Sequence, residues 1–317
     1  MMREKEPEAP GQPGVIATIA AGFDLITGHL WLMTLPVLLD LWLWLGPRLT
    51  TSSLLTQSLA PLQGEPQLAA FTEQMVALAP RVNWFTLLSF PVIGVPTLMT
   101  GPTPEKIPIA ASLVDIASMS QWFLIFFGLN MAGLLLAILF YNGLAQALRA
   151  GPFDAAQFGR RLLRSGMKLV GLVLVFGLCL LIIGVALLPV ALILSLVGLG
   201  ATPAVLLGGV VAIWLAIYLF FSIHGIVLYD AGIFPAMLTS VRLVQVQIWP
   251  TLLLLLSIVV VGGGLNTLWR QVDNGSWLTL VSILGHGFIN TALVMSTFVF
   301  YRDRIAPAQQ QIAHTAS

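Results

Sequence analysis

Three polar side chains recur at every fourth position of an apolar run near the end of the chain. Ser282, His286 and Asn290 lie in the run LTLVSILGHGFINTALV, and residues four apart share one face of a helix. An imidazole titrates near neutral pH and can bind a metal or relay a proton. With Asn130 from another apolar run, these residues form a candidate polar pocket. The alternative, which we favour, is hydrogen bonding between membrane helices, because no carboxylate near the bilayer centre accompanies His286.

A single carboxylate, Asp40, interrupts the apolar stretch MTLPVLLDLWLWLGPRL. A charge in lipid is costly, so Asp40 is a candidate cation or proton site. It lies only about 9–10 Å from the outer end of its helix, at about 1.5 Å per residue. Charges near a helix end cost less than central ones. We therefore favour an outer-interface carboxylate that reaches headgroups, the outer loop or Arg48.

Four basic residues cluster before the third apolar run, namely Arg160, Arg161, Arg164 and Lys168. Basic residues at a membrane surface attract anionic lipid headgroups by about 1 kcal/mol each. The cluster is a candidate contact for anionic lipid, and it also indicates which side of the membrane is cytoplasmic.

Sequence motifs for catalysis are missing. The chain contains no H-E-x-x-H, no G-x-S-x-G and no G-x-x-x-x-G-K-[ST] pattern, and no metal-ligand spacing. We therefore expect a protein that is not an enzyme, that binds no metal or other cofactor, and that has no nucleic-acid partner.

The composition requires contact with lipid. Hydrophobic residues make up 58% of the chain and charged residues only 9%, whereas a soluble domain has roughly 25% charged residues. A membrane-spanning helix needs about 20 mainly apolar residues. Six segments qualify, near 27–46, 121–142, 168–195, 203–228, 250–268 and 276–300.

A seventh apolar stretch, 83–99, contains Pro91 and Pro96, and proline breaks a helix. We expect it to be re-entrant or interfacial. With six spans, ten basic residues gather on the side of both termini and four on the other side. Cytoplasmic loops are enriched in Lys and Arg, so the sequence predicts a multi-pass plasma-membrane protein with both termini in the cytoplasm.

Three stretches with amphipathic or helical spacing precede the first, third and fifth spans, at 14–31, 153–168 and 230–250. Such helices lie in the membrane interface. The expected fold is therefore all-α, with six transmembrane helices in three hairpins, each preceded by a cytoplasmic interfacial helix. We expect a disordered tail at 1–14, a membrane domain at 15–305 with an outer cap at 47–120, and a second tail at 306–317.

The last third of the chain contains the stretch AMLTSVRLVQVQIWPTLLLLL, with Ala236, Ser240, Arg242 and Trp249, preceded by Asp230. In these residues the chain resembles a broad group of bacterial six-helix membrane proteins. That group is similar to the membrane part of some glycerophosphodiester phosphodiesterases. The resemblance implies a six-helix fold and transfers no activity, because the chain lacks a phosphodiesterase domain.

The function that these patterns favour is that of a non-enzymatic scaffold or accessory subunit of a membrane complex. Its partners would be membrane lipids and other membrane protein subunits. The alternative is a carrier or binder of a lipid or other amphipathic solute, which would use the polar stripe of His286 on the sixth span.

Overall fold

The computed structural model describes residues 13–62, 68–90, 94–100, 107–109, 112–149, 153–272 and 275–316, with side chains up to 305. The described chain is all-α apart from two three-residue strands. The elements are α1 (Val15–Gly28), η1 (Leu30–Met33), α2 (Thr34–Leu45), β1 (Arg48–Thr50), α3 (Ser52–Leu59), η2 (Ala60–Leu62), α4 (Ala69–Leu78), η3 (Ala79–Arg81), η4 (Trp84–Ser89), β2 (Leu113–Asp115), α5 (Met119–Ala147), α6 (Ala155–Leu196), α7 (Thr202–Leu219), α8 (Ser222–Tyr229), α9 (Ile233–Val246), α10 (Ile248–Trp269) and α11 (Thr279–Ala316).

Five of the described helical segments are long and apolar enough to cross a membrane, and a sixth forms if α1 and the following helix count as one bent span. Four of these segments contain the predicted second to fifth spans, and the last, Thr279–Ile305, contains the predicted sixth span except for its first three residues. The predicted first span, 27–46, is not one straight helix. Helix α1 meets the segment Leu30–Leu45 at 94°, and α2 itself has only 12 residues.

Two further boundaries differ from the expectation. The stretch 153–168 does not form a separate helix, because α6 runs unbroken for 42 residues from Ala155. Asp154 caps its first turn through the backbone N–H groups of Ala156 and Gln157, and no proline lies between that turn and Lys168. At the other end of the chain, α11 continues to Ala316, through most of the predicted tail.

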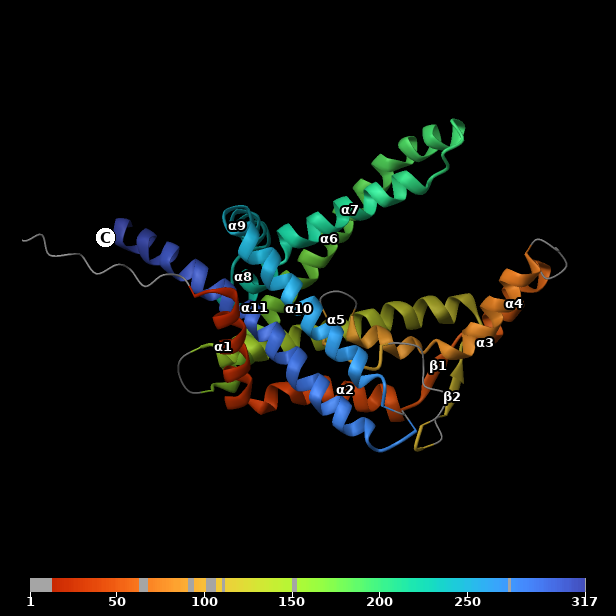
Figure 1. Ribbon diagram of the computed structural model, residues 1–317, viewed down its shortest axis with the longest axis horizontal. Helices are drawn as coiled ribbons and strands as arrows, with labels where there is room; N and C mark the ends of the chain where they lie inside the picture. The colour runs from red at the N-terminus through yellow and green to blue at the C-terminus, as the bar shows by residue number, and fades with distance from the viewer. Residues whose placement is uncertain are drawn as a thin grey trace, which may run out of the picture. The chain divides into compact units, whose positions relative to one another are not determined.

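The chain divides into two compact units. The first takes in the described residues of Met1–Thr18, Leu148–Leu255 and Phe298–Ser317, and the second those of Ile19–Ala147 and Leu256–Thr297. In the first unit, α6 and α7 run side by side as a helical hairpin (Figure 1). Their turn contains Gly198 and Gly200 with φ of +83° and +68°, a backbone conformation that glycine adopts without strain.

The helix of the fourth predicted span is interrupted between α7 and α8. Ser240 of α9 hydrogen-bonds the backbone groups at this interruption. Its hydroxyl accepts a hydrogen bond from the Phe221 N–H at 3.0 Å and donates one to the Tyr218 carbonyl at 2.7 Å. Ser240 is fully buried. Its side chain therefore faces the junction of α7 and α8.

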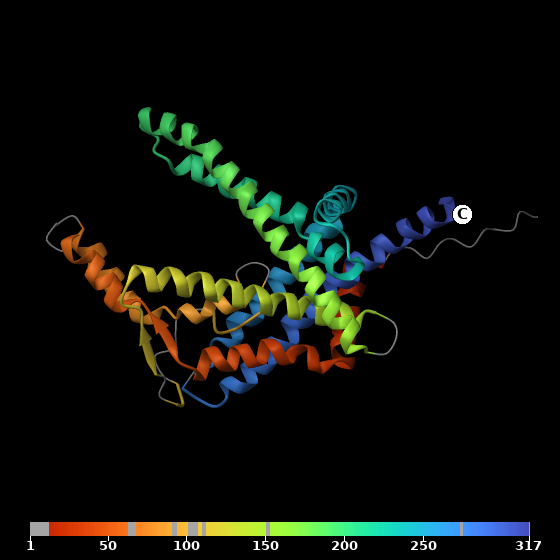
Figure 2. The same cartoon turned by 180° about the vertical axis from the view of Figure 1, so that it is seen from behind.

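In the second unit, two strands far apart in the sequence pair in parallel, with Arg48 opposite Leu113 (Figure 2). The carboxylate of Asp115, at the end of β2, accepts hydrogen bonds from the N–H groups of Ser52 and Ser53 at 2.8 and 3.0 Å. These are orphan donors in the first turn of α3. Partial desolvation raises the pKa of Asp115, but the hydrogen bonds outweigh it and hold this pKa below its ordinary value.

The described part of 83–99 is not a membrane-spanning helix. Its one regular element is η4, which packs alongside α5. The backbone of η4 approaches Gly133 so closely that a Cβ atom there would lie 2.5 Å from the Leu87 carbonyl oxygen. Gly133 lies about 21 Å along α5 from Met119, at about 1.5 Å per residue. The element therefore lies beside the middle of α5.

Candidate functional site

Asp40 lies within the second unit and is fully buried. Its Oδ1 atom accepts hydrogen bonds from the backbone N–H groups of Leu98 and Met99 at 2.8 and 2.9 Å. Its Oδ2 atom lies 3.0 Å from the same Leu98 nitrogen. The structure thus places the carboxylate against the segment that returns from η4, within the predicted outer cap.

A basic side chain binds the carbonyl group of Leu98, whose N–H group is bonded to Asp40. Arg270, directly after α10, donates a hydrogen bond to the Leu98 carbonyl at 3.2 Å. Both backbone polar groups of Leu98 are therefore paired with ionisable side chains. Irregular backbone in an apolar environment needs such partners, so Asp40 and Arg270 act here as a clamp on the segment. Sequence patterns gave no signal for this pairing, since Leu98 is 58 residues from Asp40.

The polar stripe of α11 is bonded to α10. The His286 Nδ1 atom lies 2.6 Å from Oδ1 of Asn266, and Asn290 donates to the His286 carbonyl at 3.1 Å. The same Nδ1 atom also lies 3.1 Å from the side-chain nitrogen of Asn290, so it contacts one acceptor and one donor. Asn266 is the partner that the sequence analysis missed, although it also occupies an apolar run.

The other two members of the predicted pocket behave differently. Asn130 donates to the Phe126 carbonyl of its own helix at 2.8 Å, and no hydrogen bond among the described residues joins it to the stripe. Ser282 Oγ and His286 Nε2 are buried and have no hydrogen-bond partner in the described part of the chain. No group of three metal-ligating side chains occurs in that part either.

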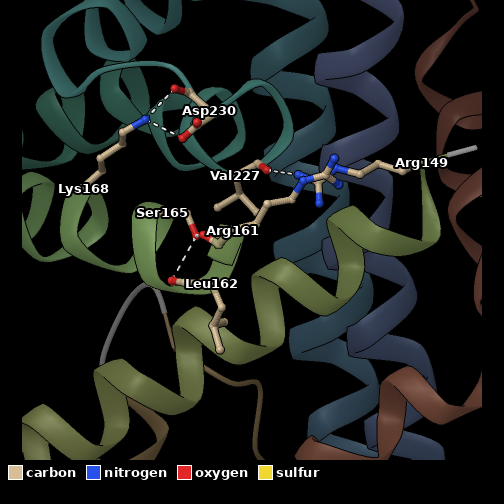
Figure 3. Close-up of polar contacts among 7 residues, drawn as sticks. All are labelled: Arg149, Arg161, Leu162, Ser165, Lys168, Val227 and Asp230. Carbon is tan, nitrogen blue, oxygen red and sulfur yellow. Dashed lines mark hydrogen bonds and ion pairs between the residues drawn. The ribbon is translucent and has the colours of Figure 1, made fainter. Parts of the chain in front are cut away.

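The predicted basic cluster divides between two faces of α6. Arg160 and Arg164 are exposed, whereas Arg161 and Lys168 are half-buried. Lys168 forms an ion pair with Asp230 and also donates to its backbone carbonyl (Figure 3). Asp230 ends α8 in the left-handed conformation, with φ of 54°. The ammonium group of Lys168 is therefore already neutralised by this turn.

Arg149 lies just after α5 and is one of the ten basic residues on the predicted side of both termini. Its Nη2 donates to the Val227 carbonyl near the end of α8, where helix carbonyls lack intrahelical donors. Its Nη1 is buried without a partner among the described residues. Desolvation lowers the pKa of Arg149, the positive charge of Arg161 lowers it further, and Asp230 raises it. Arg149 and Arg161 therefore lie within electrostatic reach of each other.

The fold and these sites define a class: a helical, membrane-embedded protein with five or six candidate spans. No family model, curated protein or solved structure matches the chain. The residues and their contacts therefore carry the functional argument alone.

Proposed function

We propose that this protein is a non-enzymatic scaffold or accessory subunit of a membrane complex. The observation that carries the proposal is that Asp40, the one carboxylate in its apolar run, hydrogen-bonds a backbone segment. Its Oδ1 alone accepts two backbone N–H bonds, and the group is fully buried. A carboxylate that holds a backbone segment in place supports a structural role better than passage of a cation.

The proposal includes the finer topology. Six spans, counting the bent first one, keep both termini in the cytoplasm of a bacterial cell, with the protein in the plasma membrane. The ten-to-four distribution of basic residues supports this orientation. The proposal also includes a family relationship to bacterial six-helix membrane proteins. Three residues that carry this resemblance, Asp230, Ala236 and Ser240, lie at the corner of α8 and α9.

A second candidate function is a carrier or binder of a lipid or other amphipathic solute. It is favoured by the buried Ser282 Oγ and His286 Nε2 atoms, which have no protein partner in the described residues. A bound hydroxyl or amide group that hydrogen-bonds these atoms would stabilise the buried polar pair.

Native mass spectrometry of the protein extracted from its own membranes in lipid nanodiscs distinguishes the two. The scaffold proposal expects a second protein at fixed stoichiometry, retained by a His286→Leu variant. The carrier proposal expects a bound small molecule that is lost in the His286→Leu variant. The matched control is Asn130→Leu, because the hydrogen bond that Asn130 donates within the described residues stays in its own helix. Both proposed functions are contradicted if wild-type protein retains neither a second protein nor a small molecule.

A further inference from the structure

Two arginine side chains converge at the end of α8. Arg161 extends from α6, and Arg149 enters from the segment after α5, so that their guanidinium groups point toward one another (Figure 3). Only Arg149 is anchored, through its bond to the Val227 carbonyl. The Arg161 side chain donates no hydrogen bond to a described residue and is half-buried. Two cations at close range repel each other unless an anion lies between them.

The carboxylates nearby do not supply that anion. Asp230 forms its ion pair with Lys168, and Asp303 forms one with Arg302. Among the described residues, neither Arg149 nor Arg161 forms an ion pair. Asp230 acts on Arg149 only from beyond ion-pair distance. Within the described residues, the corner thus holds two guanidinium groups without an ion-pair partner, and Nη1 of Arg149 is buried without a hydrogen-bond acceptor.

The place of the pair in the chain suggests what the anion is. Arg149 lies two residues beyond the end of α5, and Val227 lies in the last turn of α8. Both helices belong to candidate spans, so their ends lie near the membrane surface. The forked guanidinium group matches phosphate geometry, and arginine is the residue that most often binds phosphate in this bidentate manner.

We propose that Arg149 and Arg161 together bind one phosphate group, as carried by an anionic lipid headgroup. The phosphate oxygens accept from Nη1 of Arg149 and from the fork of Arg161, and the bond from Arg149 to Val227 is kept. A soluble phosphate ester presents the same chemistry. This site is independent of the scaffold function and of the stripe on α11.

The test reconstitutes the full chain in nanodiscs of phosphatidylcholine with a small fraction of phosphatidylglycerol, and native mass spectrometry measures the retained phosphatidylglycerol. Arg161→Gln is the decisive variant, because Arg161 donates no hydrogen bond to a described residue. We expect its affinity for phosphatidylglycerol to fall at least about fivefold. Arg242→Gln, at an exposed position of α9 outside the basic cluster of α6 and with the same loss of charge, should change affinity less than about twofold.

Three further measurements complete the design. Arg161→Lys keeps the charge without the fork and should recover only part of the binding. Titration of glycerol phosphate into the discs that contain phosphatidylglycerol identifies a soluble source if glycerol phosphate displaces the retained lipid. Thermal unfolding confirms that each variant is folded. Equal losses for Arg161→Gln and Arg242→Gln would show a diffuse surface charge and overturn the site, as would wild type that retains neither phosphatidylglycerol nor glycerol phosphate.

Discussion

Replacement of Asp40 separates its hydrogen bonds from its charge. Because Oδ1 accepts both backbone N–H groups, an Asp40→Asn variant can keep both bonds with its carbonyl oxygen, while its NH2 group replaces Oδ2 at 3.0 Å from the Leu98 nitrogen. It loses the charge assistance, which is worth about 1 kcal/mol per bond. We therefore expect Asp40→Asn to lower the free energy of unfolding by about 1–2 kcal/mol.

Asp40→Leu removes the acceptor altogether. Two buried N–H groups then lack a partner, at a cost of about 1–3 kcal/mol each, and Arg270 loses its nearby anion. The expected loss is at least about 3 kcal/mol. The control is Asp24→Asn, since Asp24 is exposed on α1 and such changes usually stay within about 0.5 kcal/mol.

The assay is reversible unfolding in bicelles, combined with hydrogen exchange of the segment 94–100. Asp40→Leu should raise exchange at Leu98 and Met99, and Asp40→Asn should raise it less. Unchanged stability and unchanged exchange in Asp40→Leu would refute the clamp. A variant that stays as stable as wild type but abolishes ion or proton movement would instead make Asp40 a transport site.

Three other predictions follow from single contacts. Gly133→Ala should destabilise the protein by about 1–3 kcal/mol because its Cβ meets the η4 backbone, whereas Gly128→Ala, with open space around it, should be neutral or slightly stabilising in the same unfolding assay. The pKa of Asp115 is lowered in the folded state, so its contribution is present above the unfolded pKa of about 3.9 and is lost as the pH falls through the folded value. The protection of amides at the start of α3, relative to their intrinsic hydrogen-exchange rates, should therefore fall below about pH 4, and Asp115→Asn should abolish this dependence. Ser240→Ala should cost about 1–3 kcal/mol by thermal unfolding because it orphans a buried N–H, while Ser195→Ala, which removes an exposed bond within α6, should cost less than about 0.5 kcal/mol.

Local sequence was a good guide to the long apolar helices and a poor guide to where they break. Hydrophobicity is a property of a short window, so runs such as 121–142 and 250–268 coincide with α5 and α10. Where a helix is interrupted depends on which groups can hydrogen-bond the backbone there. The interruption between α7 and α8 is stabilised by Ser240, which comes from a different helix, and no pattern within the run itself indicates it.

The sequence by itself determined that the chain is helical and suited to lipid, and which polar residues occur within apolar runs. Only the tertiary structure decided what these residues contact. Asp40 meets a backbone segment 58 residues away, and Arg149 reaches a carbonyl 78 residues away. Such pairings depend on where a segment returns in space, and helical periodicity describes only neighbours within about one turn.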